Sequence, residues 1–143
     1  MVVERTLSLI KPDALEKGCV GKIITRFEEA KLKLVASKML WLTRKEAEQF
    51  YSVHKGKHFF ETLIQFITSG PLFALVLEGE NAILKNRDIM GATDPRKALP
   101  GTLRGDFAKD VGDKIERNIV HGSDASETAK IEIPFFFSDR EIF

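Results

Sequence analysis

The first third of the chain alternates between strand-like and helix-like patterns of apolar residues. Apolar and small polar residues alternate over residues 6–10 and predict a strand. The segment 11–13 ends it, because its proline cannot donate to a strand ladder. Apolar residues at helical spacing over 20–27 then predict an amphipathic helix, and residues 33–42 predict a second strand.

The middle of the chain predicts two helices followed by a buried strand. Thr43 and Glu46 have the spacing of a capping box, so a helix should begin there. A short helix is expected over 59–67, before a Ser-Gly-Pro stop. The apolar run LFALVL at 72–77 is typical of a central strand covered on both sides.

The last third predicts one helix, one irregular stretch and one strand. The helix is expected over roughly 80–89, and periodicity is poor between 91 and 121. An irregular stretch of this length in a small domain is usually functional. The last strand is expected over 131–137, at a sheet edge because it contains Pro134.

This order of elements predicts an α+β fold. The natural candidate is a ferredoxin-like βαββαβ arrangement, with a four-stranded, mainly antiparallel sheet and helices packed on one face. In that topology the third strand is central and the fourth lies at an edge. A length of 143 residues favours a single domain, 1–143, with one core.

Composition and charge narrow the class of protein. Hydrophobic residues make up 43% of the chain, and 22 basic against 21 acidic residues leave a net charge of +1. This balance argues against a general nucleic-acid or membrane surface. No stretch has membrane-spanning length and no secretion signal is evident, so a cytoplasmic location is expected. Cys19 is the only cysteine, which excludes an internal disulfide.

The segment NIVHGSD, residues 118–124, is the strongest candidate for chemistry. Gly122 permits a tight turn beside His121, and Asp124 with Glu127 has capping-box spacing for a following helix. A helix N-terminus favours an anion such as phosphate, and histidine can act as a nucleophile. The alternative is a turn histidine without a chemical role.

Three cationic side chains suit phosphate binding. Lys11 is expected at a strand end, where it could neutralise a phosphate, or it could be a solvated lysine before a turn. Arg87 and Arg104 lie in or near the irregular stretch, whose arginines and hydroxyls suit phosphoryl transfer. Ordinary turns with surface arginines are the alternative. Neither a P-loop nor a protein-kinase motif is present.

Aromatic residues flank a loop that contains two further histidines. Tyr51 precedes this loop and Phe59 follows it. Phe59 is left open between stacking on a base and packing in the core. His54 and His58 are weaker candidates than His121, because no comparable turn and cap surround them.

With these residues assembled, the sequence closely resembles the nucleoside diphosphate kinase family over nearly its whole length. NIVHGSD matches the family's active-site signature, NxxHGSD. RTLSLIKPDA, FF..L..F..SGP, GATDP, PGTLRGDF and the terminal EIPFFF agree with the family in order and spacing. Six such segments in register make a chance match very improbable.

The resemblance implies a role for each matching residue. His121 would be the nucleophile, phosphorylated on Nδ1, with Glu132, one strand away, and Ser123 holding its ring. The remaining roles concern the nucleotide: Lys11 and Asn118 at the sugar 3′-hydroxyl, Tyr51 and Arg104 at the terminal phosphate, Arg87 and Thr93 at the preceding phosphate, and Phe59 on the base with Leu63 and Val111 lining its slot.

The resemblance also implies a cofactor and partners. Members need Mg²⁺ bridged between phosphate oxygens, and Asp124 would reach it through water. The substrates would be nucleoside di- and triphosphates with broad base and sugar tolerance. A homo-oligomer, tetramer or hexamer, is expected, with no membrane and no nucleic acid as partner.

The chain departs from the family pattern in two places. It carries extra residues at about 113–116, which affects the placement of Val111, and the family's RPFF is replaced by Lys57-His58-Phe59-Phe60. It ends soon after the last expected strand, as bacterial members do. A nucleotide-binding module without turnover is the main rival, and a nucleic-acid-binding protein is the second.

Overall fold

The computed structural model describes residues 3–143. Met1 and Val2, which belong to the predicted domain 1–143, lie outside the described residues. The strands are β1 (Val3–Ile10), β2 (Lys33–Leu40), β3 (Leu72–Glu80) and β4 (Val120–Gly122). The α-helices are α1 (Pro12–Lys17), α2 (Val20–Glu29), α3 (Arg44–Phe50), α4 (Phe60–Ile67), α5 (Ala82–Met90), α6 (Leu103–Phe107) and α7 (Ser126–Phe136). Short 3₁₀ helices are η1 (Ser52–His54), η2 (Pro95–Lys97), η3 (Lys109–Val111) and η4 (Asp139–Glu141).

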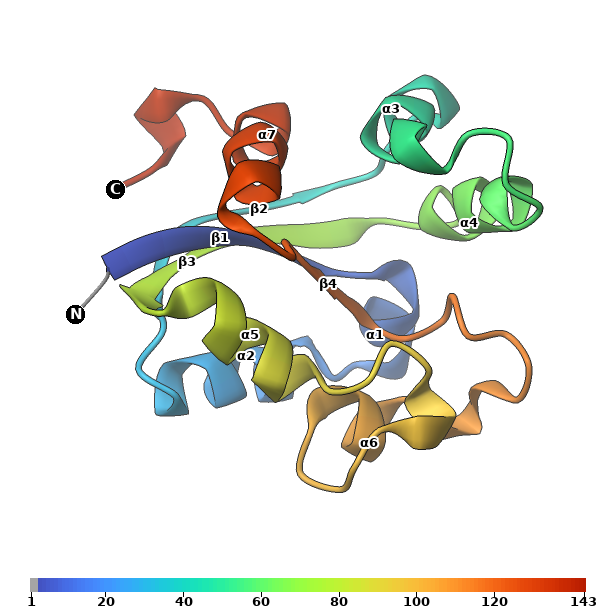
Figure 1. Ribbon diagram of the computed structural model, residues 1–143, viewed down its shortest axis with the longest axis horizontal. Helices are drawn as coiled ribbons and strands as arrows, with labels where there is room; N and C mark the ends of the chain where they lie inside the picture. Colours follow the sequence, from blue (N-terminus) through green and yellow to red (C-terminus); the bar gives the residue numbers. More distant parts are fainter. Residues whose placement is uncertain (1–2) are drawn as a thin grey trace.

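The four strands form one antiparallel sheet in the order β2-β3-β1-β4. This is the predicted ferredoxin-like topology, with the third strand inside the sheet and the fourth at its edge (Figure 1). β3 is the buried strand that the run LFALVL predicts: Leu72, Ala74 and Val76 enter one core, while Leu75 and Leu77 enter the other.

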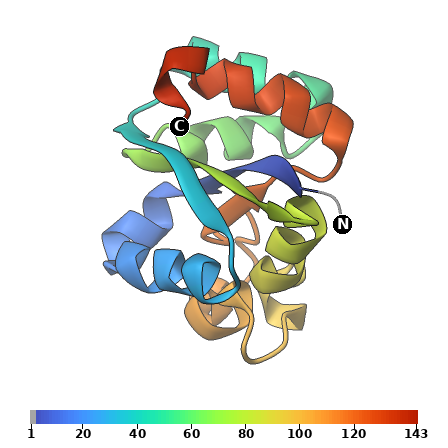
Figure 2. The same cartoon turned by 90° about the vertical axis from the view of Figure 1, so that its left-hand side faces the viewer.

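Helices cover both faces of the sheet, so the expectation of helices on one face was wrong. In Figure 1, α3, α4 and α7 lie above the sheet and α2, α5 and α6 below it, and Figure 2 shows the same two layers from the side. Each layer has its own buried cluster of apolar residues. The sheet is therefore the middle layer of three, and a residue on it can face either of two environments.

The expected last strand, 131–137, is helical in the structure. Residues 126–136 form α7, with Pro134 inside it. Ala129 and Phe136 are buried one above the other at helical spacing, whereas Ile131 is 73% exposed. The fourth, edge strand is instead β4, a three-residue segment at the end of the stretch expected to be irregular.

The predicted helix caps were confirmed at α3 but shifted at α7. At α3, Thr43 accepts the backbone N–H of Glu46 and the Glu46 side chain accepts that of Thr43. At α7 the expected pair of Asp124 and Glu127 is not used, since the N-cap is Ala125, whose N–H donates to the Thr128 hydroxyl.

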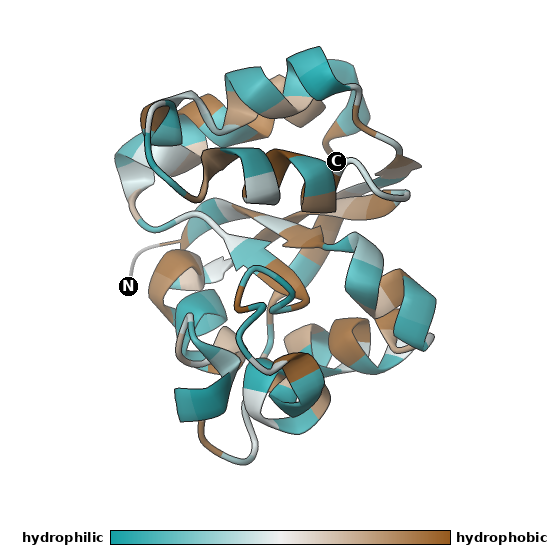
Figure 3. Cartoon of the chain, turned by 90° about the vertical axis from the view of Figure 1, so that its right-hand side faces the viewer, coloured by the Kyte–Doolittle hydropathy of each residue, from teal (hydrophilic) through white to brown (hydrophobic). Residues whose placement is uncertain are grey.

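Both hydrophilic and hydrophobic residues are visible along the helices in Figure 3. None of the helices between residues 3 and 143 is long and apolar enough to cross a membrane.

Candidate active site

His121 lies on the edge strand β4 and faces the layer of α3, α4 and α7. It pairs with Leu9 of β1, and directly opposed residues place their side chains on the same face of a sheet. Leu9 is fully buried in the core of that layer. The imidazole side chain keeps 22% of its surface exposed, so a ligand can reach it.

One carboxylate oxygen contacts both His121 and Ser123. Glu132 Oε1 lies 3.2 Å from His121 Nε2 and accepts the Ser123 hydroxyl at 2.7 Å. The Ser123 Oγ accepts the backbone N–H of Leu7 at 3.3 Å, which ties the group to β1. Since an ionised carboxylate only accepts hydrogen bonds, this contact puts the proton of a neutral imidazole on Nε2 and leaves the lone pair on Nδ1.

Two aromatic residues at the end of α3 pack beside the imidazole. The Phe50 ring makes an edge contact with His121, with centroids 5.3 Å apart, and Tyr51 packs on Phe50 at 5.0 Å. Tyr51 is buried, and its hydroxyl has no hydrogen-bond partner among residues 3–143. Burial, and then the negative charge of Glu132, raise the pKa of this phenol. It therefore remains a donor that an incoming phosphate oxygen can use.

Lys11 directly follows β1 and is buried. Its Nζ donates to Asn118 Oδ1 at 2.7 Å, and Asn118 Nδ2 donates to the carbonyl of Thr93 at 2.9 Å. Burial, and then the positive charge of Arg104, lower the pKa of Lys11 to about 7. Lys11 is thus a cation whose charge changes near neutral pH in the free protein.

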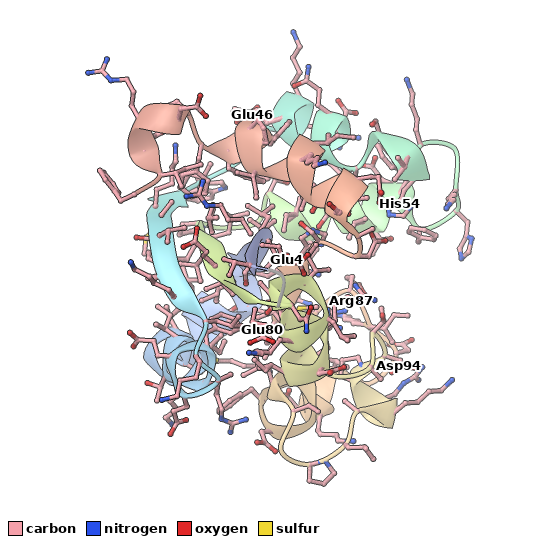
Figure 4. All side chains as sticks on the ribbon, turned by 60° about the vertical axis from the view of Figure 1, so that its left-hand side comes forward. Glu4, Glu46, His54, Glu80, Arg87 and Asp94 are labelled. Carbon is pink, nitrogen blue, oxygen red and sulfur yellow. The ribbon has the colours of Figure 1, made fainter. Side chains whose placement is uncertain are left out.

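Arg104 is buried and held by backbone carbonyls. Its Nε donates to Asn118 at 3.1 Å, and its terminal nitrogens donate to Gly91 at 3.0 Å and Val120 at 2.7 Å. Each terminal nitrogen keeps a second N–H that can reach a phosphate. Burial, and then the charge of Arg87, lower the pKa of Arg104 to about 10. Figure 4 shows Arg87 itself on α5, in the layer opposite to η1 and its His54.

The backbone just before His121 is strained. Ile119 is fully buried and has a φ of 63°, a region that β-branched residues rarely adopt. The N–H of Val120 donates to the Asn118 carbonyl at 2.8 Å, which closes a γ-turn around Ile119. The Ile119 N–H donates to Asp13 Oδ2 at 3.1 Å, and its carbonyl accepts the N–H of Lys11 at 2.7 Å. Residues 11–13 therefore hold both peptide groups of the turn.

The three residues expected at the base lie in different surroundings. Phe59 is 38% exposed, and the His54 ring lies 5.3 Å from it and 6.1 Å from Tyr51. Leu63 packs against the core of the α3, α4 and α7 layer, whereas Val111 packs in the core on the other side of the sheet. The slot between Phe59 and Val111 stays a prediction.

The surroundings of Asp124 fit a magnesium ion that a nucleotide brings with it. No group of three or more His, Cys, Asp or Glu side chains within residues 3–143 could hold a metal. Asp124 is exposed next to the active-site turn, with Oδ1 accepting the Thr128 hydroxyl at 2.8 Å. Mg²⁺ commonly takes one or two carboxylates and fills its other positions with phosphate oxygens and water.

Comparison with known proteins decides the family. The family model described as nucleoside diphosphate kinase matches residues 4–142. The chain belongs to the nucleoside diphosphate kinase family. The nucleoside diphosphate kinase of Wolinella succinogenes is 64% identical over 140 residues, which cover 98% of this chain and 99% of that protein. The family assigns the chain to the ATP-dependent phosphotransferases that act on nucleotides.

Solved structures of nucleoside diphosphate kinases have the same fold. The Aquifex aeolicus enzyme superposes with a TM-score of 0.93 at 45% identity, covering 99% of this chain and 100% of that one. The Halobacterium salinarum enzyme, solved in complex with CDP, also gives 0.93, at 42% identity, covering 99% of this chain and 92% of that one.

In this candidate site of the nucleoside diphosphate kinase chain, hydrogen bonds join most of the predicted polar residues. They link His121, Glu132 and Ser123 in one group and Lys11, Asn118, Thr93 and Arg104 in another. Sequence reasoning gave no role to Phe50 or Asp13. Asp13 lies two residues after Lys11 in the KPDA motif, but its hydrogen bond is with the backbone N–H of Ile119, which is distant in sequence.

Proposed function

We propose that this chain transfers the γ-phosphoryl group of a nucleoside triphosphate to a nucleoside diphosphate through a phosphate carried on His121 Nδ1. The contact of Glu132 with Nε2 is the observation that carries this proposal, because it leaves Nδ1 as the nitrogen with the free lone pair. A single site then serves donor and acceptor in turn, which is a ping-pong cycle.

The cycle has two balanced steps. In the first, the Nδ1 lone pair forms a bond to the γ-phosphorus while the bond to the β–γ bridging oxygen breaks, and the nucleoside diphosphate leaves with that electron pair. In the second, a terminal oxygen of an incoming diphosphate attacks the same phosphorus, and the electron pair of the P–N bond returns to Nδ1. Glu132 accepts the Nε2 hydrogen bond throughout and stabilises the positive charge that the ring acquires.

Cations on three segments would stabilise the charge on the phosphoryl oxygens. Lys11 and Arg104 are buried close to the active-site turn, and Arg87 lies near Arg104. Phosphoryl transfer depends mostly on positioning and charge stabilisation, so fixed cations of this kind account for much of the expected rate. We assign Tyr51 and Arg104 to the terminal phosphate, and Arg87 with Thr93 to the preceding one.

The nucleotide would otherwise be held by its sugar and by the face of its base. Lys11 and Asn118 would contact the 3′-hydroxyl, and Phe59 would stack on the base beside Leu63 and Val111. Stacking does not distinguish bases, which supports broad base tolerance. Asp124 would hold magnesium through water, and the bound ion neutralises charge on the phosphate oxygens.

The assembly and boundaries of the protein belong to the same proposal. We expect residues 1–143 to act as one kinase domain, and copies of the chain to form a tetramer or hexamer. The cytoplasmic location stays a prediction from the sequence.

Incubation with γ-labelled ATP tests the proposal. Acid-labile, alkali-stable label should appear on the wild-type protein and on the control His58→Ala, but not on His121→Ala. The label should leave as GTP when GDP is added. Nucleotide binding without label would favour a binding module, and wild-type turnover by His121→Ala would refute the proposed mechanism.

A further inference from the structure

The turn at Ile119 connects the nucleophile to the nucleotide-binding residues. The turn lies between Asn118 and the strand that carries His121, and the Asn118 side chain accepts a hydrogen bond from Lys11. The carbonyls of Asn118 and Val120 on either side of it accept hydrogen bonds from Arg104. A change in this turn would therefore move the imidazole, the amide and the anchor of the guanidinium together.

Such a turn is not stable without support. A buried, β-branched residue at positive φ costs on the order of 1–3 kcal/mol, and the surrounding structure has to offset that cost. The support comes from residues 11–13: the backbone N–H of Lys11 bonds the Ile119 carbonyl, and Asp13 Oδ2 accepts the Ile119 N–H at 3.1 Å.

Asp13 is unusual for a residue that only supports a turn. It is buried, and its Oδ1 has no hydrogen-bond partner among residues 3–143. Burying a carboxylate is costly, and a neutral acceptor could bond the same N–H more cheaply. Burial raises the pKa of Asp13, whereas the charges of Lys11 and Lys17 lower it, and Arg104 also faces the carboxyl.

We propose that Asp13 is a positioning residue for phosphoryl transfer: its carboxylate holds the Ile119 turn that aims His121, and it places a negative charge near Lys11 and Arg104. This inference rests on the proposed phosphorylation of His121. The charge matters because the groups that face Lys11 are Arg104 from α6, Asp13 from α1 and Glu116 from the segment before β4. Burial and Arg104 lower the pKa of Lys11, whereas Asp13 and Glu116 raise it.

Two substitutions separate the hydrogen bond from the charge. Asp13→Asn keeps an oxygen that can accept the Ile119 N–H but loses the charge, whereas Asp13→Ala loses both. Asp139→Asn is the matched control, since Asp139 is an exposed aspartate in η4, outside the site. The rate of His121 phosphorylation by MgATP would be measured from about pH 6 to about pH 9, together with thermal unfolding.

We expect Asp13→Asn to have the same thermal unfolding as the wild type. Its phosphorylation rate should begin to fall about one pH unit lower on the alkaline side, because the charge that raises the pKa of Lys11 is gone. Asp13→Ala should lose roughly 100-fold in rate at every pH, because the nucleophile is no longer aimed. Asp139→Asn should match the wild type. A purely structural role would lower the stability of the variants without moving the alkaline limb.

Wild-type rate and pH dependence in Asp13→Asn would overturn this inference, and the proposed function would stand if His121→Ala is still inactive. Absence of phosphate on wild-type His121 would overturn both. If Asp13→Asn does not fold, ¹³C NMR of the wild-type Asp13 carboxyl decides the matter: it should be ionised at about pH 7. A carboxyl still protonated there would contradict the proposed charge.

Discussion

At the residue scale, Glu132 determines which nitrogen of His121 is free. Its Oε1 accepts hydrogen bonds from the imidazole Nε2 and from Ser123, and Ser123 is fixed in turn to the backbone of β1. One carboxylate thus sets both the orientation of the ring and the nitrogen that carries its proton, as is usual for catalytic histidines.

Replacing that carboxylate should impair the chemical step. The amide of Glu132→Gln can turn its NH₂ toward the ring, which would move the proton to Nδ1. We expect kcat to fall by roughly 10- to 1000-fold, with little change in KM for ATP, because Glu132 orients the ring and is not assigned to the nucleotide. Steady-state kinetics with ATP and a diphosphate acceptor measure this. Glu127→Gln, an exposed change on the same helix, should keep wild-type kcat, and an equal fall in both variants would contradict the assigned role.

Lys11 should give the reaction a pH dependence. Its pKa is lowered to about 7 by burial and by Arg104, so the free protein loses this cation as the pH rises. Since kcat/KM reports the free enzyme, it should fall up to tenfold per pH unit above about pH 7. Lys11→Arg, which stays charged, should lack this limb. A wild-type kcat/KM that is flat to about pH 9 would show that the charge of Lys11 is not required.

Some residues of the site could be predicted from the sequence, and others could not. His121, Lys11 and Arg104 could be proposed from residue type and neighbouring turns, because nucleophiles and cations have recognisable chemistry. The roles of Glu132, Asn118 and Thr93 came only from family resemblance. Asp13 could not be found by either route, because its function depends on Ile119, which is distant in sequence and has an unusual backbone conformation.

At the scale of elements, β4 and α5 approach closely at Gly122. A Cβ there would lie 2.4 Å from Asn86 Nδ2 and 2.8 Å from Met90 Cε. Gly122→Ala should therefore lower the free energy of unfolding by about 1–3 kcal/mol, as overpacking does. Urea denaturation measures this, with Gly21→Ala as control, since a Cβ on Gly21 of α2 meets nothing within 4 Å. If Gly122→Ala had the wild-type free energy of unfolding, α5 would have to be able to move away from β4 without cost.

The segment 131–137 shows why an element's type can be wrong while the fold class is right. Its short apolar run fits a strand or a buried helix equally well by periodicity, and Pro134 opposes both. In the structure, α7 tolerates Pro134 near its C-terminal end, and it buries Ala129 and Phe136 on the layer that contains His121. Tertiary packing decided between the two, and it also brings Glu132 from this helix to the imidazole.

At the scale of the whole molecule, the sheet separates two cores and the active site lies at its edge strand. The four-stranded topology follows from the order of elements, but the presence of helices on both faces does not. The apolar run 72–77 indicated that both faces are covered, since β3 sends apolar side chains to both sides of the sheet. His121 comes from β4 of the sheet and Glu132 from α7 on one face, whereas Arg104 and Arg87 come from α6 and α5 on the other.

The proposed assembly is also a property of the whole molecule. On the proposed tetramer or hexamer, we expect sedimentation equilibrium to give a mass four or six times that of one 143-residue chain. His121→Ala should have the same mass, since the imidazole contacts Glu132 and Phe50 of its own chain. A single-chain mass at micromolar concentration would contradict the proposed assembly.

The position of the phosphate on the His121 ring tests the central claim most directly. The wild-type protein, phosphorylated with ATP and labelled with ¹⁵N in its histidines, can be measured by ³¹P and ¹⁵N NMR. The hydrogen bond from Nε2 to Glu132 predicts one phosphate, bonded to Nδ1 and lost on addition of GDP. A phosphate on Nε2, or on any other residue, would contradict the account.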